Sequence, residues 1–301
     1  MLYSNPLRRA ACAVSFALLG AASAFGGETL DAIKNTGTIT LGYRENAIPF
    51  SWQTRDGQVV GYAVETCLHV ASAVQEHLKL PRLNVRYVPV TSADRVRFIL
   101  DKRIDLECGV TTNTPARREQ VALGLTYFYA GARLMVREGE SIGSLQDMVG
   151  KTLGLVKGTT GELILQKHQR QHTDAWKPML FDSTDDAVLA LEHGRVDGVL
   201  TDDVQLLARA RQSSRALALV GPTLSIEPLT LAFNKRDREL ADLVQGEMKQ
   251  LYRSGAMRAM YQRWFSMPLP DVGYSMDLAP GKLLSDNFLR PSTYVADWVI
   301  L

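Results

Sequence analysis

The stretch "VPVTSADRVRFILDKRIDLECGVTTNTPARREQ", residues 88–120, contains the alternation of elements that decides the fold. Apolar and β-branched residues predict that one strand ends at residue 90 and that another spans residues 104–110. Residues 93–103 have the periodicity of an amphipathic helix, and Pro115 takes the first position of a second helix predicted over residues 115–123. Strand, helix, strand and helix in succession indicate a mostly parallel sheet with helices on both faces.

The same alternation continues on both sides of this stretch. Strands are predicted at residues 38–43, 83–90, 132–137, 151–158, 196–202 and 229–235, and helices at residues 63–78, 161–171, 184–195, 238–265 (broken at Gly255) and 280–289. There are too many strands for one unit of ordinary size, so we expect an α/β protein of two doubly wound lobes. We place lobe one at residues 25–130 and 228–301 and lobe two at residues 131–227, joined by hinge strands.

The first 24 residues have the pattern of a secretory signal peptide. Arg8 and Arg9 precede fifteen uncharged residues that end in Ala22-Ser23-Ala24. No later segment approaches 18 uninterrupted apolar residues, so we expect a soluble protein exported to the periplasm. Cleavage takes two arginines from the 34 basic residues and leaves 32 against 32 acidic ones. This near-neutral balance argues against binding to nucleic acid or to an anionic membrane.

Export would leave two cysteines, Cys67 and Cys108, in an oxidising compartment. Cys67 falls on a helical pattern and Cys108 in a strand pattern, both at apparently buried positions. We therefore expect two inert buried thiols, with a disulfide as the alternative. Their spacing of 41 residues resembles no metal motif, and we expect neither a metal ion nor a cofactor.

Two predicted helix starts carry a hydroxyl followed by an arginine. Ser92 is expected to cap the helix that carries Arg95, and Thr114 to cap the helix that carries Arg117. Because the start of a helix already carries partial positive charge, an arginine there is unfavourable unless an anion is present. A surface arginine beside an ordinary cap is the alternative for either one taken alone. Thr159 and Glu162 have the spacing of a capping box at a third such junction.

Further charged residues follow predicted strands. Arg44 follows the first strand, and Asp202 follows the strand "VDGVL", with Asp203 as the alternative acid. In doubly wound sheets, ligands bind outside the carboxyl ends of the strands, where these residues are expected to meet. Guanidinium groups, hydroxyls and free backbone N–H groups gathered at that edge predict an anion-binding site with one acidic counter-charge.

Longer segments are similar to a known family. "TLDAIKNTGTITLGYRENAIPFSW", "VPVTSADR", "DLECGVTTNTPARREQ", "KTLGLVKGTTGE", "ALEHGRVDGVLTDD" and "MYQRWFSMPLP" resemble, in this order, bacterial extracytoplasmic solute-binding proteins for polar amino acids. Within that family the chain looks most like the branch that binds glutamate and aspartate for ABC importers. The resemblance covers essentially the whole mature chain and implies a type II periplasmic binding protein-like fold.

The resemblance also implies a role for individual residues. Arg44, Ser92 and Arg95 match the positions that hold the side-chain carboxylate of the ligand in that branch. Thr112 and Arg117 match the clamp on the α-carboxylate. In the second lobe, Thr160 matches a hydroxyl of the branch, and Asp202 matches the acid that faces the α-ammonium group of the ligand. Two positions depart from the branch: Val110 replaces a serine, and Thr184 replaces a histidine. These two departures leave the preference between glutamate and aspartate open.

The leading hypothesis is a non-catalytic periplasmic receptor, expected to be monomeric. Its lobes would close over an acidic amino acid, and the closed form would dock on an inner-membrane ABC permease. A secreted dehydratase on the same fold is the alternative from another class, because fold alone does not separate the two. A soluble sensor is a third possibility.

Overall fold

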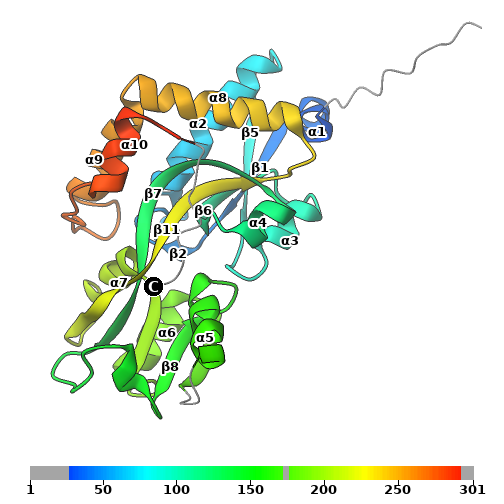
Figure 1. Cartoon of the computed structure of the whole chain (residues 1–301). Helices are drawn as coiled ribbons and strands as arrows, with labels where there is room; N and C mark the ends of the chain where they lie inside the picture. The colour runs from blue at the N-terminus through cyan, green and yellow to red at the C-terminus, as the bar shows by residue number, and fades with distance from the viewer. Residues whose placement is uncertain (1–26, 172–175, 293–301) are drawn as a thin grey trace, which may run out of the picture.

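One eight-stranded sheet runs through both lobes of the computed structural model, which describes residues 27–171 and 176–292 (Figure 1). In order across the sheet, the strands are β5 (Asn84–Pro89), β1 (Thr38–Tyr43), β6 (Leu106–Thr112), β11 (Leu217–Phe233), β7 (Ala122–Arg137), β10 (Gly198–Asp202), β8 (Thr152–Val156) and β9 (Lys177–Phe181). The helices are α1 (Glu28–Thr36), α2 (Tyr62–His77), α3 (Arg95–Leu100), α4 (Pro115–Gln120), α5 (Thr160–Gln171), α6 (Thr184–Glu192), α7 (Asp203–Ala210), α8 (Arg238–Arg253), α9 (Ala256–Ser266) and α10 (Lys282–Leu289), with a 3₁₀ helix η1 (Leu145–Met148). The predicted α/β class is confirmed.

The strands are parallel at each end of the sheet and antiparallel in the middle. β1 pairs in parallel with β5 and β6, and β8 pairs in parallel with β9 and β10. The long strands β7 and β11 pair with each other, β7 also pairs with β10, and β11 also pairs with β6. All three pairings are antiparallel. They run from one lobe into the other and so connect the two (Figure 1). Sequence periodicity found only one end of each, because their middle residues have no simple alternation.

Each lobe has its own core. In the lobe that contains β8, Leu153 and Leu155 pack with Ile164 of α5, whereas Val156 packs with Leu191 of α6 on the other face of the sheet. This arrangement is the doubly wound layering expected from alternating strands and helices. The boundaries at residues 130/131 and 227/228 stay a prediction, and the predicted signal peptide lies outside the described residues.

Two predictions that depend only on neighbouring residues, a helix cap and a helix break, are confirmed. The hydroxyl of Thr114 accepts a hydrogen bond from the backbone N–H of Arg117, as an N-cap should. Gly255 has a φ of 81° and separates α8 from α9, which is the predicted break. The small sheet of β2 (Asn46–Ala47), β3 (Ser51–Gln53) and β4 (Val59–Val60) was not predicted, because strands this short leave no periodic pattern.

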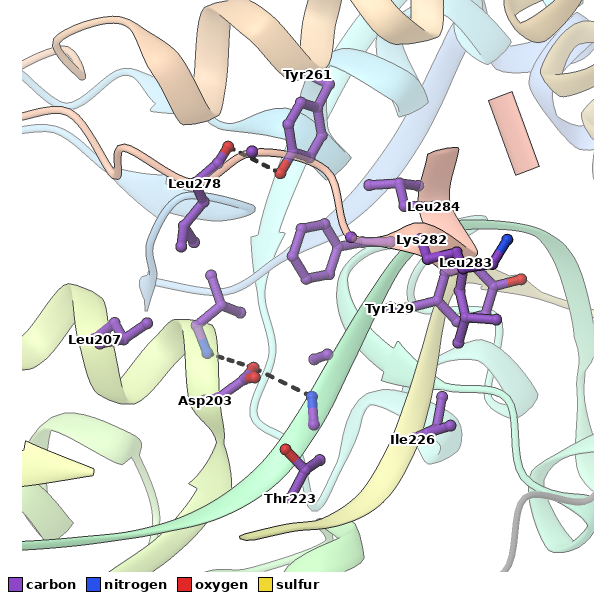
Figure 2. A pocket seen from close by; sticks show the side chains of 16 residues that line it. Tyr129, Asp203, Leu207, Thr223, Ile226, Tyr261, Leu278, Lys282, Leu283 and Leu284 are labelled. Carbon is purple, nitrogen blue, oxygen red and sulfur yellow. Dashed lines mark hydrogen bonds between the residues drawn. The ribbon is translucent and has the colours of Figure 1, made fainter. Parts of the chain in front are cut away.

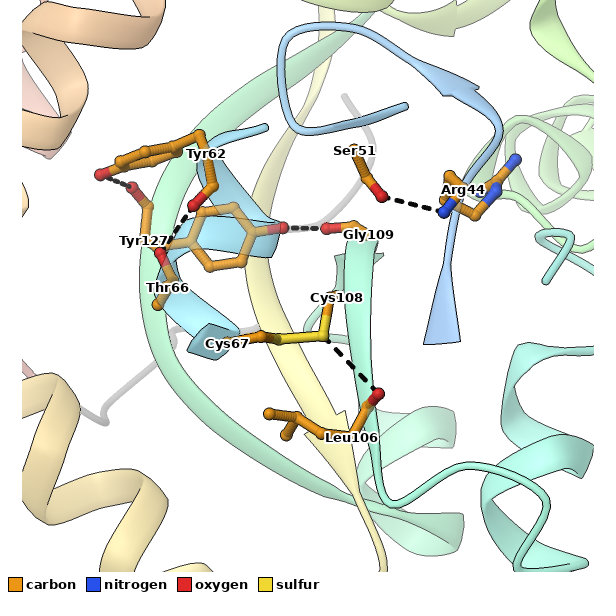
Figure 3. Close-up of a disulfide and its surroundings, with 9 residues drawn as sticks. All are labelled: Arg44, Ser51, Tyr62, Thr66, Cys67, Leu106, Cys108, Gly109 and Tyr127. Atoms are coloured by element: carbon orange, nitrogen blue, oxygen red, sulfur yellow. Dashed lines mark hydrogen bonds between the residues drawn. A yellow bond between two sulfur atoms is a disulfide. The ribbon is translucent and has the colours of Figure 1, made fainter. Parts of the chain in front are cut away.

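The expectation of two free thiols was wrong. Cys67 of α2 and Cys108 of β6 form a disulfide, with their Cα atoms 6.0 Å apart and both side chains fully buried (Figure 3). Helical and strand periodicity place each cysteine on an inward face, but they do not show which residue of β6 lies opposite Cys67. That pairing depends on how α2 crosses the sheet. The bond ties the helix covering the sheet to the strand that leads into the site described below.

We predict that replacing both cysteines by serine lowers the free energy of unfolding by about 2–4 kcal/mol, because a disulfide restricts the unfolded chain. Chemical denaturation of the wild type and of the double variant, without reductant, measures the difference. Equal denaturation midpoints, or two titratable thiols in the unfolded unreduced wild type, would contradict this assignment.

Candidate functional site

Two buried arginines lie side by side at the carboxyl edge of the first lobe. Arg44 follows β1 and is 7% exposed, and Arg95 opens α3 and is 2% exposed. Arg44 is fixed at both ends. Its backbone N–H donates to Oγ of Ser51 at 2.9 Å (Figure 3), and its Nη1 donates to Oγ of Ser92 at 2.7 Å. Ser92 was predicted to cap the helix of Arg95, and this was wrong. Its hydroxyl instead accepts from Arg44.

The residues flanking Ser92 explain this difference. The backbone N–H of Thr91 donates to the carboxylate of Asp94, and the backbone N–H of Asp94 donates to the hydroxyl of Thr91. This closed turn precedes α3, which begins only at Arg95. Because the turn satisfies its own backbone groups, Ser92 is free to face the arginines.

Arg95 and the half-buried Arg117 of α4 contact the second lobe. Nη1 of Arg95 donates to the carbonyl of Val110 at 3.2 Å, and Nη1 of Arg117 donates to the carbonyl of Thr112 at 2.9 Å. Their Nη2 atoms both point to the carbonyl of Gly158, just before α5, at 3.5 Å and 2.9 Å respectively. Both arginines therefore hold β6 on one side and reach across the gap between the lobes on the other.

The second lobe contributes hydroxyls and one carboxylate. Thr160 opens α5 and Thr184 opens α6, while Asp202 ends β10, where Nε2 of Gln205 donates to it at 2.9 Å. Together with the first lobe these residues line a small cavity of about 10 Å³. Its lining consists of Ser92, Arg95, Val110, Thr112, Arg117, Thr159, Thr160, Thr184, Thr201, Asp202 and Gln205.

The structure brings all nine predicted site residues together. Eight of them line the cavity, and Arg44 lies behind it, bonded to Ser92. Sequence reasoning missed Thr201 and Gln205, and it considered Thr159 only as part of a capping box. Thr201 precedes Asp202 in the same strand, and Gln205 follows Asp202 by about one helical turn. Their closeness to the predicted residue Asp202 is the signal that could have identified them. The roles assigned to the nine residues stay predictions.

Burial makes the positive charge of this site costly. Burial lowers the pKa of Arg44 to about 10, and that of Arg117 to about 9, with repulsion by Arg95 as the second cause in each case. Burial likewise lowers the pKa of Arg95. Arginine side chains stay cationic near neutral pH, so the three form a positively charged group: Arg95 and Arg117 line the small cavity, and Arg44 lies behind it.

The pKa of Asp202 moves in the opposite direction. Burial, together with the carboxylates of Glu227 and Asp203, raises it to about 7, while the bond from Gln205 and the charge of Arg95 oppose the change. Burial disfavours the charged form of any group, which for an acid means a higher pKa. A cationic group bound beside Asp202 would relieve this cost.

A larger and mostly apolar cavity lies against β7 and β11, the two strands that connect the lobes. Phe128, Tyr129 and Leu207 are among its lining residues, together with the segment that leads into α10 (Figure 2). Asp203 faces this cavity and not the charged one, and one of its oxygens accepts from the backbone N–H groups of Gly131 and Val204. Between the two acids considered from the sequence, the structure therefore places Asp202 in the charged site.

Neither a cluster of metal-ligating side chains nor a membrane-spanning helix is found in the described ranges. Among residues 27–171 and 176–292, no three acids, histidines or cysteines come together as a metal site would require. The helices of these ranges also include none that is long and apolar enough to cross a membrane.

Known proteins with similar sequences and structures carry amino acids. Residues 39–267 match the family of bacterial extracellular solute-binding proteins, family 3. The glutamate/aspartate import solute-binding protein of Salmonella typhimurium is 31% identical, with 88% of this chain and 89% of the relative covered. The L-glutamate/L-aspartate-binding protein of Pseudomonas aeruginosa is also 31% identical, over 89% and 90% of the two chains. An ancestral arginine-binding protein bound to arginine superposes with a TM-score of 0.69 at 28% identity, over 76% of this chain and 98% of its own.

The raised pKa of Asp202 predicts a pH dependence of stability in the ligand-free protein. The folded state holds this proton more tightly than the unfolded state, so the contribution of Asp202 is greatest at low pH and is lost as pH rises through about 7. Between about pH 5.5 and about pH 8.5, wild type should therefore lose more stability than Asp202→Asn. Urea denaturation of both proteins at the two pH values measures this difference, and identical losses would show that Asp202 is not buried as described.

Proposed function

Because the chain belongs to the bacterial extracellular solute-binding proteins of family 3, and the relatives named above are transport binding proteins and not enzymes, we propose that it binds an acidic amino acid, glutamate or aspartate, in the cleft between its lobes. One observation carries the proposal: Arg95 and Arg117 from the first lobe and Asp202 from the second line a single small cavity, and Arg44 lies directly behind it, bonded to Ser92. We place the protein in the periplasm, where it would deliver its ligand as a monomer to an inner-membrane ABC permease.

The charges of the cavity match those of a dicarboxylic amino acid. Such a ligand carries two carboxylates and one ammonium group, so a site that buries it needs two cationic groups and one anion. Arg44 with Arg95 would bind one carboxylate, Arg117 would bind the other, and Asp202 would face the ammonium group. A basic amino acid would bring a second cation against Arg44 and Arg95, and an apolar one would leave both without an anion.

The family resemblance supports which carboxylate each arginine binds. The side-chain carboxylate would lie near Arg44, Ser92 and Arg95, and the α-carboxylate near Thr112 and Arg117. The departure at position 110 is compatible with this arrangement, because the carbonyl of Val110 already accepts from Arg95 and needs no hydroxyl to do so. Thr184 keeps a hydroxyl on the cavity wall where the branch has a histidine.

The arginines also couple ligand binding to closure. Arg95 and Arg117 belong to the first lobe, and both point to the carbonyl of Gly158 in the second. A ligand bound to these guanidinium groups would thus lie against the second lobe, and its ammonium group would add the contact with Asp202. The lobes would then close over the ligand about β7 and β11, which is a hinge movement of a known kind.

We predict that Arg95→Ala weakens glutamate and aspartate binding by about a hundredfold or more. Removing one partner of a buried charge pair costs about 3–5 kcal/mol, and each 1.4 kcal/mol corresponds to about tenfold in affinity. Arg117→Ala should lose every α-amino acid alike, whereas Arg95→Ala should admit glutamine or asparagine weakly. Calorimetric titration of each variant with these four amino acids measures both effects.

The matched control is Arg97→Ala, on the same helix. The side chain of Arg97 is 81% exposed and pairs with Asp101, so its removal should leave the affinity within about twofold of wild type. Arg95→Lys should restore binding only in part, because lysine has no planar fork of donors. If Arg95→Ala binds glutamate as well as Arg97→Ala does, the proposed role of Arg95 is wrong.

A further inference from the structure

The strand between the arginines carries a buried acid that the ligand does not explain. Glu107 lies on β6 and is 0% exposed. Among the described residues, neither of its carboxylate oxygens has a hydrogen-bond partner. An ionised carboxylate this deep is costly unless charges of the opposite sign surround it. Glu107 does not line the ligand cavity, so its role must lie behind the cavity wall.

The position of Glu107 is fixed by a close approach at Gly109. Glu107 and Gly109 are two apart on β6 and thus point to the same face of the sheet. A Cβ at position 109 would collide with Oε1 of Glu107 and would lie 2.7 Å from Cγ of Arg44. The carboxylate of Glu107 and the stem of Arg44 therefore both lie close to the Cα of Gly109.

The charge of Glu107 acts on all three arginines. Its carboxylate raises the pKa of Arg44, Arg95 and Arg117 and so opposes the lowering that burial imposes. Other acids face these arginines as well: Asp94 faces Arg44 and Arg95, Asp202 faces all three, and Glu227 faces Arg117. For Arg44, Glu107 is the strongest of the acids, and for Arg95 it is again the strongest.

The arginines do not depend on Glu107 for their geometry. Arg44 is held by Ser92, and Arg95 by the carbonyl of Val110, whereas no hydrogen bond joins either one to Glu107 among the described residues. A group that acts through charge and not through a directed bond changes the potential at the site and leaves the positions of the donors alone.

We infer that Glu107 is a specificity-determining residue: its carboxylate moderates the positive charge that Arg44 and Arg95 present to the side chain of the ligand. The inference rests on the proposed function, since it concerns the end of the cavity assigned to the side-chain carboxylate. Glu107 thereby limits how strongly the site prefers an acidic amino acid over its amide. Without this charge the arginines would hold the acid more tightly than a carrier that must release its ligand needs.

The test compares glutamate and glutamine binding in Glu107→Gln, a near-isosteric change that removes only the charge. Glutamate should bind about tenfold more tightly than in wild type, because a neighbouring buried charge has been removed. Glutamine, which has no charge on its side chain, should change by less than about threefold. The glutamine-to-glutamate ratio of dissociation constants, measured by calorimetry, should therefore rise.

Thr111→Val is the matched control. Thr111 lies on the same face of β6, is 0% exposed, and its hydroxyl has no hydrogen-bond partner among the described residues. Its replacement disturbs the strand without changing any charge, so the ratio should stay as in wild type. Glu107→Asp, which keeps the charge, should also preserve the ratio.

Several results would overturn the inference. If Glu107→Gln changes glutamate and glutamine binding by the same factor, or weakens glutamate, the residue has a structural role only. If Glu107→Gln does not fold, Glu107→Met is titrated in its place, and failure of both to fold makes Glu107 a folding residue and refutes the inference. A wild type that does not bind glutamate refutes the proposed function itself, and the inference with it.

Discussion

The clustering of three guanidinium groups at one small cavity, two of them buried and the third half-buried, is the constraint on which the rest of this structure depends. Taking cations out of water is costly unless fixed partners replace the lost hydration. The protein supplies carbonyls from β6 and from Gly158, the hydroxyl of Ser92, and the carboxylates of Glu107 and Asp202. Gly158 and Asp202 belong to the second lobe, so the full set of partners surrounds the charges only when the lobes face each other.

The fold provides this arrangement because its strands end at the cavity. β1, β6 and β10 deliver Arg44, Thr112 and Asp202 to one edge, and the helices that follow begin there. The disulfide between α2 and β6 fixes the strand whose carbonyls hold two of the arginines. β7 and β11 then connect the lobes through the middle of the sheet, which lets the lobes move without separating the two halves of the site.

Much of the site could be predicted because its residues occupy positions with a local signature. Arg95 and Arg117 stand in the first turn of helices where a cation is unfavourable, and Asp202 follows a strand. The sequence could not show that Ser92 turns toward Arg44, that Cys67 meets Cys108, or that Glu107 lies over Gly109. Each of these depends on how separate elements pack, and a buried acid in a strand gives no periodic signal of its own. The long middle strands were only partly found for the same reason.

The most direct test is a calorimetric titration of the wild-type protein, stripped of bound ligand, against each of the twenty amino acids. The cavity described here should bind glutamate or aspartate most tightly. The dissociation constants of their amides and of the apolar and basic amino acids should be higher by about a hundredfold or more. Tightest binding of a basic or an apolar amino acid would contradict the account, because the buried arginines would then face a ligand that carries no second carboxylate.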